Sequence, residues 1–182
     1  MKKALLVALS TTVLCAAVGN AKEVIQANAV HVGGSVRSSH LVVYLDRYST
    51  DEERARWREV FAAGGQEALV AKWQEENPKV GTCSFTQSIG YQLRAAISVP
   101  TEKGRRIYMA TDRPIAGFEV MRGARSQDYP IGWIEVEVDA EGKGEGRFVG
   151  AAEFSVEDGH LVMKTYGTEP VRLVNVVVRT KE

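Results

Sequence analysis

Hydrophobic and polar positions alternate with two different periods along this chain. From Ser49 to Asn77 the apolar residues recur every three or four positions, which is the period of an amphipathic helix. On both sides of that segment apolar and polar residues alternate, as they do in half-buried strands. The pattern therefore predicts one helical region set between two groups of strands.

The helical region is predicted to form two helices, at 51–63 and 66–76, separated by Gly64-Gly65. Glycine readily takes the left-handed conformation that ends a helix, and Asn77-Pro78 ends the second one. We expect a helical hairpin whose two tryptophans are core anchors. The supporting residues are two possible capping boxes (Ser49 with Glu52, or Thr50 with Glu53) and the apolar positions Trp57, Val60, Phe61, Leu69, Val70 and Trp73.

The strand-like segments are joined by short connections, which favour antiparallel pairing of successive strands. Alternation places Phe148, Gly150, Ala152, Phe154 and Val156 on one face of a single strand. The predicted fold class is α+β: a curved antiparallel β-sheet, a barrel- or sandwich-like meander, with one helical hairpin. The predicted strands are 24–32, 40–45, 80–88, 91–98, 105–110, 134–139, 147–156, 161–166 and 171–179.

The first 21 residues have the three parts of a secretory signal peptide. Lys2 and Lys3 precede an apolar run of about 15 residues, which is shorter than the roughly 20 that a membrane-spanning helix needs. Small residues then favour cleavage after Ala21, with Ala17 as a second option. Cys15 raises the alternative of a lipoprotein signal, although a leucine precedes it. We expect residues 1–21 to be a signal peptide and residues 22–182 to be a single domain, exported to the periplasm or outside the cell.

Composition narrows the choice of partners. The chain has 23 basic and 23 acidic residues, so its charge gives no reason to expect nucleic acid or an anionic membrane surface as a partner. No membrane span is expected after signal cleavage. The exported domain would keep one cysteine, Cys83, and therefore no intrachain disulfide. We expect Cys83 to be a buried strand residue; the alternative is a reactive or intermolecular thiol.

The densest polar cluster lies in two predicted loops. Arginine side chains bind carboxylate or phosphate in a bidentate manner, and a neighbouring tyrosine can add a hydrogen bond. The alternative is that the acids pair with the arginines and hold the loops in place. The candidate binding residues are Asp112, Arg113, Arg125, Asp128 and Tyr129.

The sequence contains no pattern typical of catalysis or of a bound cofactor. No Gly-x-Ser-x-Gly occurs, and Gly142, Gly144 and Gly146 suit a turn better than a phosphate loop. His31 and His40 could meet across a hairpin, but no third metal ligand is evident nearby. We therefore predict no catalytic residues, no metal and no cofactor.

Several short motifs are spread over most of the chain after residue 21. They occupy 49–54, 64–69, 78–81, 105–107, 110–115, 125–130, 142–146 and 169–173. Together they resemble a family of small exported bacterial proteins, met as hypothetical proteins in acidobacteria and similar soil bacteria. That family has no established activity, so the resemblance implies export and a single domain but no catalytic residues.

These observations predict an exported, non-catalytic protein that binds a small ligand or an envelope partner. A secreted or periplasmic hydrolase with its site in the loops at 112–129 is one alternative. A structural or assembly protein that pairs through an exposed sheet edge is the other.

Overall fold

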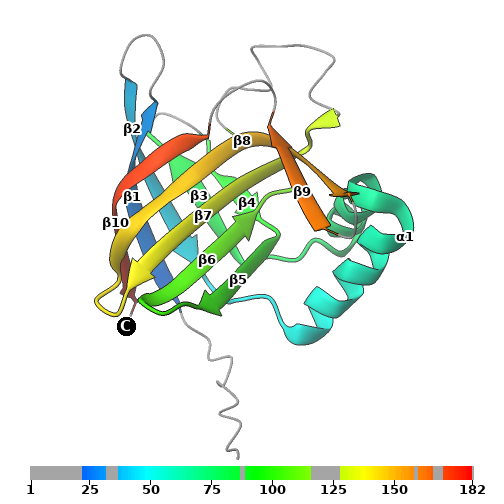
Figure 1. Ribbon diagram of the computed structural model, residues 1–182, viewed down its shortest axis with the longest axis horizontal. Coiled ribbons are helices and arrows are strands. Elements are labelled where there is room, and N and C mark those ends of the chain that lie inside the picture. The colour runs from blue at the N-terminus through cyan, green and yellow to red at the C-terminus, as the bar shows by residue number, and fades with distance from the viewer. Residues whose placement is uncertain are drawn as a thin grey trace, which may run out of the picture.

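A computed structural model of the chain describes residues 22–31, 37–86, 89–115, 128–157, 160–165 and 170–181. They form one helical element and a curved antiparallel sheet that is nearly barrel-shaped (Figure 1). In chain order the elements are β1 (Glu23–His31), β2 (Arg37–Leu45), α1 (Asp51–Glu76), β3 (Gly81–Phe85), β4 (Tyr91–Leu93), β5 (Ala95–Pro100), β6 (Gly104–Ala110), β7 (Ile131–Asp139), β8 (Lys143–Glu157), β9 (His160–Thr165) and β10 (Val171–Thr180). The α+β class and the antiparallel sheet are as predicted.

The strands form two meanders, β1 to β4 and β5 to β10. The first strand, β1, pairs with the last, β10, and this pairing joins the two meanders into one sheet. The strand order is β4-β3-β2-β1-β10-β8-β7-β6-β5, and β9 pairs with β8 outside this path. Because β1 pairs with β10, this path of paired strands ends at β4 and β5, which are neighbours in the chain. The sheet therefore curves almost fully around its inner face.

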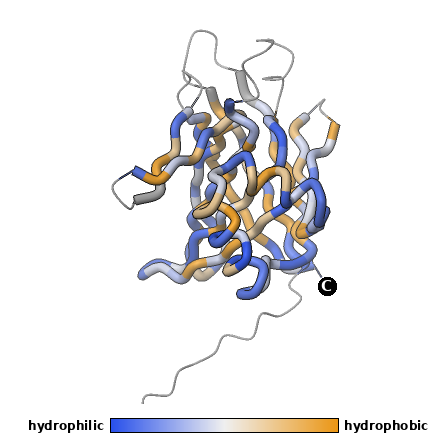
Figure 2. The backbone as a smooth tube through the Cα atoms, turned by 90° about the vertical axis from the view of Figure 1, so that its right-hand side faces the viewer, coloured by the Kyte–Doolittle hydropathy of each residue, from blue (hydrophilic) through white to orange (hydrophobic). Residues whose placement is uncertain are grey.

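Aliphatic and aromatic side chains from β1 to β8 and from β10 pack together on the inner face. Hydrophobic positions alternate with polar ones along the strands (Figure 2). Ile25, Leu41, Ile107 and Ile134 are completely buried there, and Phe85 packs on Phe148 with ring centroids 4.8 Å apart. The same core contains Cys83, whose burial was predicted and raises the pKa of its thiol to about 12.

One buried polar network ties β1 to β6 across the core. Arg105 donates to Glu23 at 2.9 Å and to the Tyr48 hydroxyl at 3.0 Å, and Tyr48 donates to Glu23 at 2.7 Å. Glu23 is only 5% exposed, so these donors replace the water that its carboxylate loses. Burial and then the hydrogen bond to Glu23 raise the pKa of Tyr48 above its usual range.

The helical element α1 begins and ends as predicted. Thr50 and Glu53 form the capping box, and Asn77 closes the helix in the left-handed conformation. At Gly65 the backbone is not helical, with φ 68° and ψ −162°, a combination that only glycine adopts easily. Arg56 and Glu76 form an ion pair at 3.0 Å, although twenty residues of straight helix would hold them roughly 30 Å apart. The two arms of α1 therefore lie side by side.

The predicted strand at 91–98 is broken at Arg94. Tyr91–Leu93 pairs with β3, whereas Ala95–Pro100 pairs with β6. Arg94 sits between them, donates its backbone N–H to Ala110 and forms an ion pair with Asp112 at 3.0 Å. Alternation alone missed this break because the two halves continue the same pattern on opposite edges of the sheet.

The prediction that Phe148 and Phe154 share one face of β8 is wrong. Trp133 lies opposite Val149, but Ile131, two residues earlier, lies opposite Ala152, three residues later. The extra residue is a β-bulge, and it reverses which side chains face inward. Phe148 therefore belongs to the inner core, while Phe154 packs on the outer face of the sheet.

Candidate functional site

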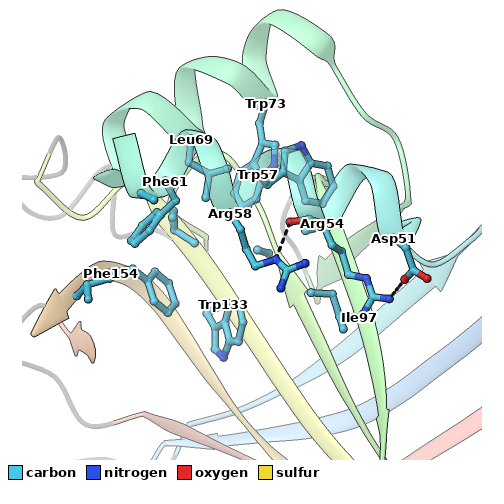
Figure 3. A pocket seen from close by; sticks show the side chains of 15 residues that line it. Asp51, Arg54, Trp57, Arg58, Phe61, Leu69, Trp73, Ile97, Trp133 and Phe154 are labelled. Carbon is cyan, nitrogen blue, oxygen red and sulfur yellow. Dashed lines mark hydrogen bonds and ion pairs between the residues drawn. The ribbon is translucent and has the colours of Figure 1, made fainter. Parts of the chain in front are cut away.

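A cavity of about 710 Å³ lies between α1 and the outer face of the sheet. We call it the helix–sheet pocket. Both arms of α1 contribute to it, and strands β5 to β8 form its opposite side (Figure 3). Its lining comprises Asp51, Arg54, Trp57, Arg58, Phe61, Ala62, Leu69, Trp73, Ala95, Ile97, Ala110, Ile131, Trp133, Phe154 and Val156.

On the sheet side, the pocket is lined in part by small residues. Ala95 of β5 lies directly opposite Ala110 of β6, and Ala110 in turn lies opposite Trp133 of β7. Both alanines are buried under the helix. Their methyl groups fill little of the space between sheet and helix, and the larger residues around them keep the helix away.

Aromatic side chains form the walls on both sides. On the helix, Trp57 and Trp73 meet edge to face with ring centroids 5.7 Å apart. On the sheet, Trp133 packs against Phe154 at 5.2 Å and against Tyr108 at 5.6 Å. Trp57, Trp73, Trp133 and Phe154 line the cavity and present broad apolar surfaces to it, while Tyr108 supports Trp133 from outside the lining.

Two arginines reach from the first arm of α1 toward the sheet (Figure 3). Arg54 forms an ion pair with Asp51, the one acidic residue of the lining. Arg58 donates only a long hydrogen bond, 3.4 Å, to the Arg54 carbonyl oxygen. Within the described ranges no acid lies in ion-pair contact with Arg58, so the pocket holds one uncompensated positive charge.

Three buried N–H groups of the lining have no hydrogen-bond partner among the described residues. They are Nε of Arg54, Nε1 of Trp57 and Nε1 of Trp73. The two tryptophan side chains are 5% and 4% exposed. Buried donors of this kind are normally paired, because an unpaired one costs roughly 1–3 kcal/mol. These three N–H groups are closed to a water-sized probe, so they lie in the packing behind the cavity wall.

Gln66 connects the helix to the sheet just after the break in α1. Its side-chain oxygen accepts from the backbone N–H of Phe154 at 2.9 Å, and its side-chain nitrogen donates to the carbonyl of Asp128 at 2.9 Å. Because Phe154 is itself part of the wall, Gln66 fixes the position of the second arm relative to the pocket.

None of the sequence-predicted binding residues that the structure describes lines this pocket. Asp112 pairs with Arg94, and the guanidinium of Arg113 lies 4.9 Å from the ring centre of Tyr91. Asp128 is exposed and Tyr129 partly buried, and both lie just before β7, at the same end of the β6–β7 pair as Asp112. Arg125 lies outside the described residues.

The two histidines considered as metal ligands are not opposite each other in the β1–β2 register. Arg37 lies opposite His31, and Asn28 lies opposite His40. The His40 ring instead contacts the Asn28 side-chain oxygen at 3.3 Å. In the part of the chain that the structure describes, no three His, Cys, Asp or Glu side chains gather as metal ligands would.

Sequence reasoning missed the pocket, although two signals were present. Arg54, Trp57, Arg58 and Phe61 have the i, i+3, i+4, i+7 spacing of one helix face, and this face mixes cations with aromatic rings. Trp133 lies on the same strand face as Glu135 and Glu137, which is an unusual place for a large apolar residue. Both signals indicate apolar surface where solvent was expected.

Comparisons with protein-family models, with curated proteins and with solved structures found no match to this chain. Within the described ranges, no helix combines the length and the apolar character that a membrane crossing requires.

Proposed function

We propose that this protein is exported and binds a small, largely apolar ligand in the helix–sheet pocket. The observation that supports this most directly is the pocket itself. A cavity of about 710 Å³ lined by five aromatic side chains lies between the helix and the sheet. Ligand pockets typically have volumes of roughly 300–1,000 Å³ and mostly apolar walls with a few polar groups.

The residues under the helix are small where the cavity lies. Ala95 and Ala110 lie directly opposite each other in β5 and β6. The inner face of the sheet, by contrast, buries large side chains such as Ile107 and Ile134 completely. Small residues beneath the helix leave room for a ligand.

The three tryptophans of the chain all line the pocket, so their fluorescence reports on it directly. The first experiment is a titration with N-phenyl-1-naphthylamine, a neutral apolar fluorophore that accepts energy from tryptophan. We expect saturable binding of one molecule per chain, with quenching of the tryptophan emission. Binding that does not saturate, or that leaves the tryptophan emission unchanged, would overturn the proposal.

Two neighbouring alanines on α1 offer a matched pair of variants. Ala62 lines the pocket and Ala63 does not, yet both are exposed on the same helical arm. The A62F change would place a ring in the cavity and should weaken probe binding by roughly tenfold, which corresponds to about 1.4 kcal/mol. The A63F change should leave binding as in the unaltered protein. Equal effects of both changes would place the probe elsewhere.

Export is supported by the charged, apolar and small-residue parts of segment 1–21 and by the resemblance to exported bacterial proteins. Expression of the full chain in a Gram-negative host, followed by fractionation and N-terminal sequencing, tests this part. We expect a chain that starts at Lys22 outside the cytoplasm. A chain that keeps Met1 in the cytoplasm would contradict it. The hydrolase and the assembly protein stay predictions, and no contact of the described residues favours either over ligand binding.

A further inference from the structure

We infer that the ligand of the helix–sheet pocket is an anionic amphiphile, an apolar molecule with a carboxylate end that Arg58 holds. This inference rests on the proposed function, because it concerns the same pocket. It adds the chemical class of the ligand and the end of the pocket at which the charged group lies.

The lining is almost wholly apolar. Five of its residues are aromatic and seven are aliphatic, and only Asp51, Arg54 and Arg58 are charged. A molecule that fills this cavity would therefore have an apolar body. The unpaired N–H groups of Arg54, Trp57 and Trp73 are closed to a water-sized probe, so they lie behind the cavity wall and do not bear on the ligand.

The charges at the pocket are not balanced within the described ranges. Arg54 already has Asp51 as a partner, and the Asp51 side chain is 75% exposed. Arg58 has no acidic partner within the described ranges, and its guanidinium lies beside the same cavity. Guanidinium groups bind carboxylates through two parallel hydrogen bonds. A ligand with one negative charge would therefore neutralise the lining.

The charged side chains of the lining come from one arm of α1. The arginines come from the first arm, one turn apart, whereas Leu69 and Trp73 of the second arm carry no charge. On the sheet side the lining is wholly apolar, from Ile97 through Trp133 to Val156. The polar groups are thus gathered on one side of an apolar cavity. This asymmetry suits a molecule with one charged end and an apolar body.

The test compares two ligands of equal chain length that differ in the end group. Decanoate carries a carboxylate and decan-1-ol a neutral hydroxyl, and each is titrated by displacement of N-phenyl-1-naphthylamine. We expect decanoate to bind at least roughly tenfold more tightly than decan-1-ol at low salt. Raising the NaCl concentration from about 20 mM to about 500 mM should weaken decanoate binding and leave decan-1-ol unchanged, because salt screens charge pairs near the surface.

Two variants locate the charged end. R58Q removes the charge and should bring decanoate affinity down to that of decan-1-ol, while R58K, which keeps the charge, should retain part of the preference. Arg56 offers the matched control, because it lies on the same arm, pairs with Glu76 and does not line the pocket. R56Q should leave the preference for decanoate intact.

The outcomes separate the inference from the proposed function. Equal affinity for acid and alcohol, or a preference for the acid that R58Q does not reduce, would overturn the inference while the fluorophore still confirms a ligand pocket. Failure of the fluorophore, the acid and the alcohol to bind would overturn both. Because Arg58 is exposed, R58Q is expected to fold, and circular dichroism would check this.

Discussion

The two faces of one sheet differ in how they are covered. On the inner face, side chains from all around the sheet meet each other and leave the largest of them fully buried. On the outer face, α1 covers strands β5 to β8. Aromatic side chains lie between the helix and the sheet, and a cavity remains among them. Trp133 and Ile134 are adjacent in β7 and belong to these two different environments.

The inner core and the region under α1 treat their buried polar groups differently. The inner core pairs its buried polar groups, as Glu23 shows with Tyr48 and Arg105. The region under α1 leaves the buried N–H groups of Trp57 and Trp73 without partners among the described residues. We interpret the first region as the source of stability and the second as the place for a ligand.

The largest expected effect is on the free energy of unfolding, and it concerns two adjacent residues of β7, Trp133 and Ile134. I134A should lower the free energy of unfolding by about 2–5 kcal/mol, because Ile134 is fully buried and its loss leaves a cavity. W133A should lower the free energy of unfolding by less, because Trp133 is only partly buried and lies beside an existing cavity. It should also remove the part of the energy transfer to the bound fluorophore that comes from Trp133. Urea unfolding followed by circular dichroism measures the first effect. A greater loss of stability from W133A than from I134A would remove the distinction between the two faces.

An intermediate effect is expected from the break in α1. G65A should destabilise the protein by about 1–3 kcal/mol, because alanine strongly disfavours the observed backbone angles. The cost is one of backbone conformation alone, since an added methyl group would have no atom within 4 Å. Thermal unfolding and probe affinity should both fall, because the second arm of α1 carries part of the pocket.

Gly90 is the control for that change. A methyl group there would have Cys83 O as its nearest neighbour at 3.8 Å, an ordinary contact, and no positive φ is involved. G90A should therefore leave stability nearly unchanged. If G65A were equally harmless, the arms of α1 would not depend on the break.

The smallest expected effect is at the start of α1 and depends on pH. The hydrogen bond from Arg47 lowers the pKa of Glu53, so this carboxylate stabilises the fold above its unfolded pKa, about 4.3, and the contribution is lost as the pH falls below it. E53Q should lower the stability by about 1 kcal/mol at pH 7. The difference from the unaltered protein should shrink at pH 3.5, as measured by urea unfolding at both values.

Glu59 serves as the control, because it is exposed on the same arm of α1 and forms no ion pair within the described ranges. E59Q should change stability little at either pH. A difference for E53Q that persists undiminished at pH 3.5 would show that the lost stability comes from packing and not from the charge.

Much of the secondary structure could be predicted because it depends on neighbours in the chain. The capping residues of α1, the break at Gly65 and the strands on either side follow from local spacing. The candidate site could not be predicted in this way. The charged residues around Asp112 and Arg113 were predicted to bind a ligand. Asp112 instead pairs with Arg94, which lies between β4 and β5. No local pattern shows which distant residue neutralises a charge.

The sequence by itself determined the α+β class, the antiparallel meander, the helical break and the burial of Cys83, because periodicity and glycine conformation act over a few residues. Only the tertiary structure decided that the first and last strands pair, that the strand at 91–98 divides at Arg94, and that a bulge in β8 turns Phe154 to the outer face. The pocket depends on the last two of these. Its lining comes from one helix and four consecutive strands, and the space between them exists only once the helix has docked on the outer face of the sheet.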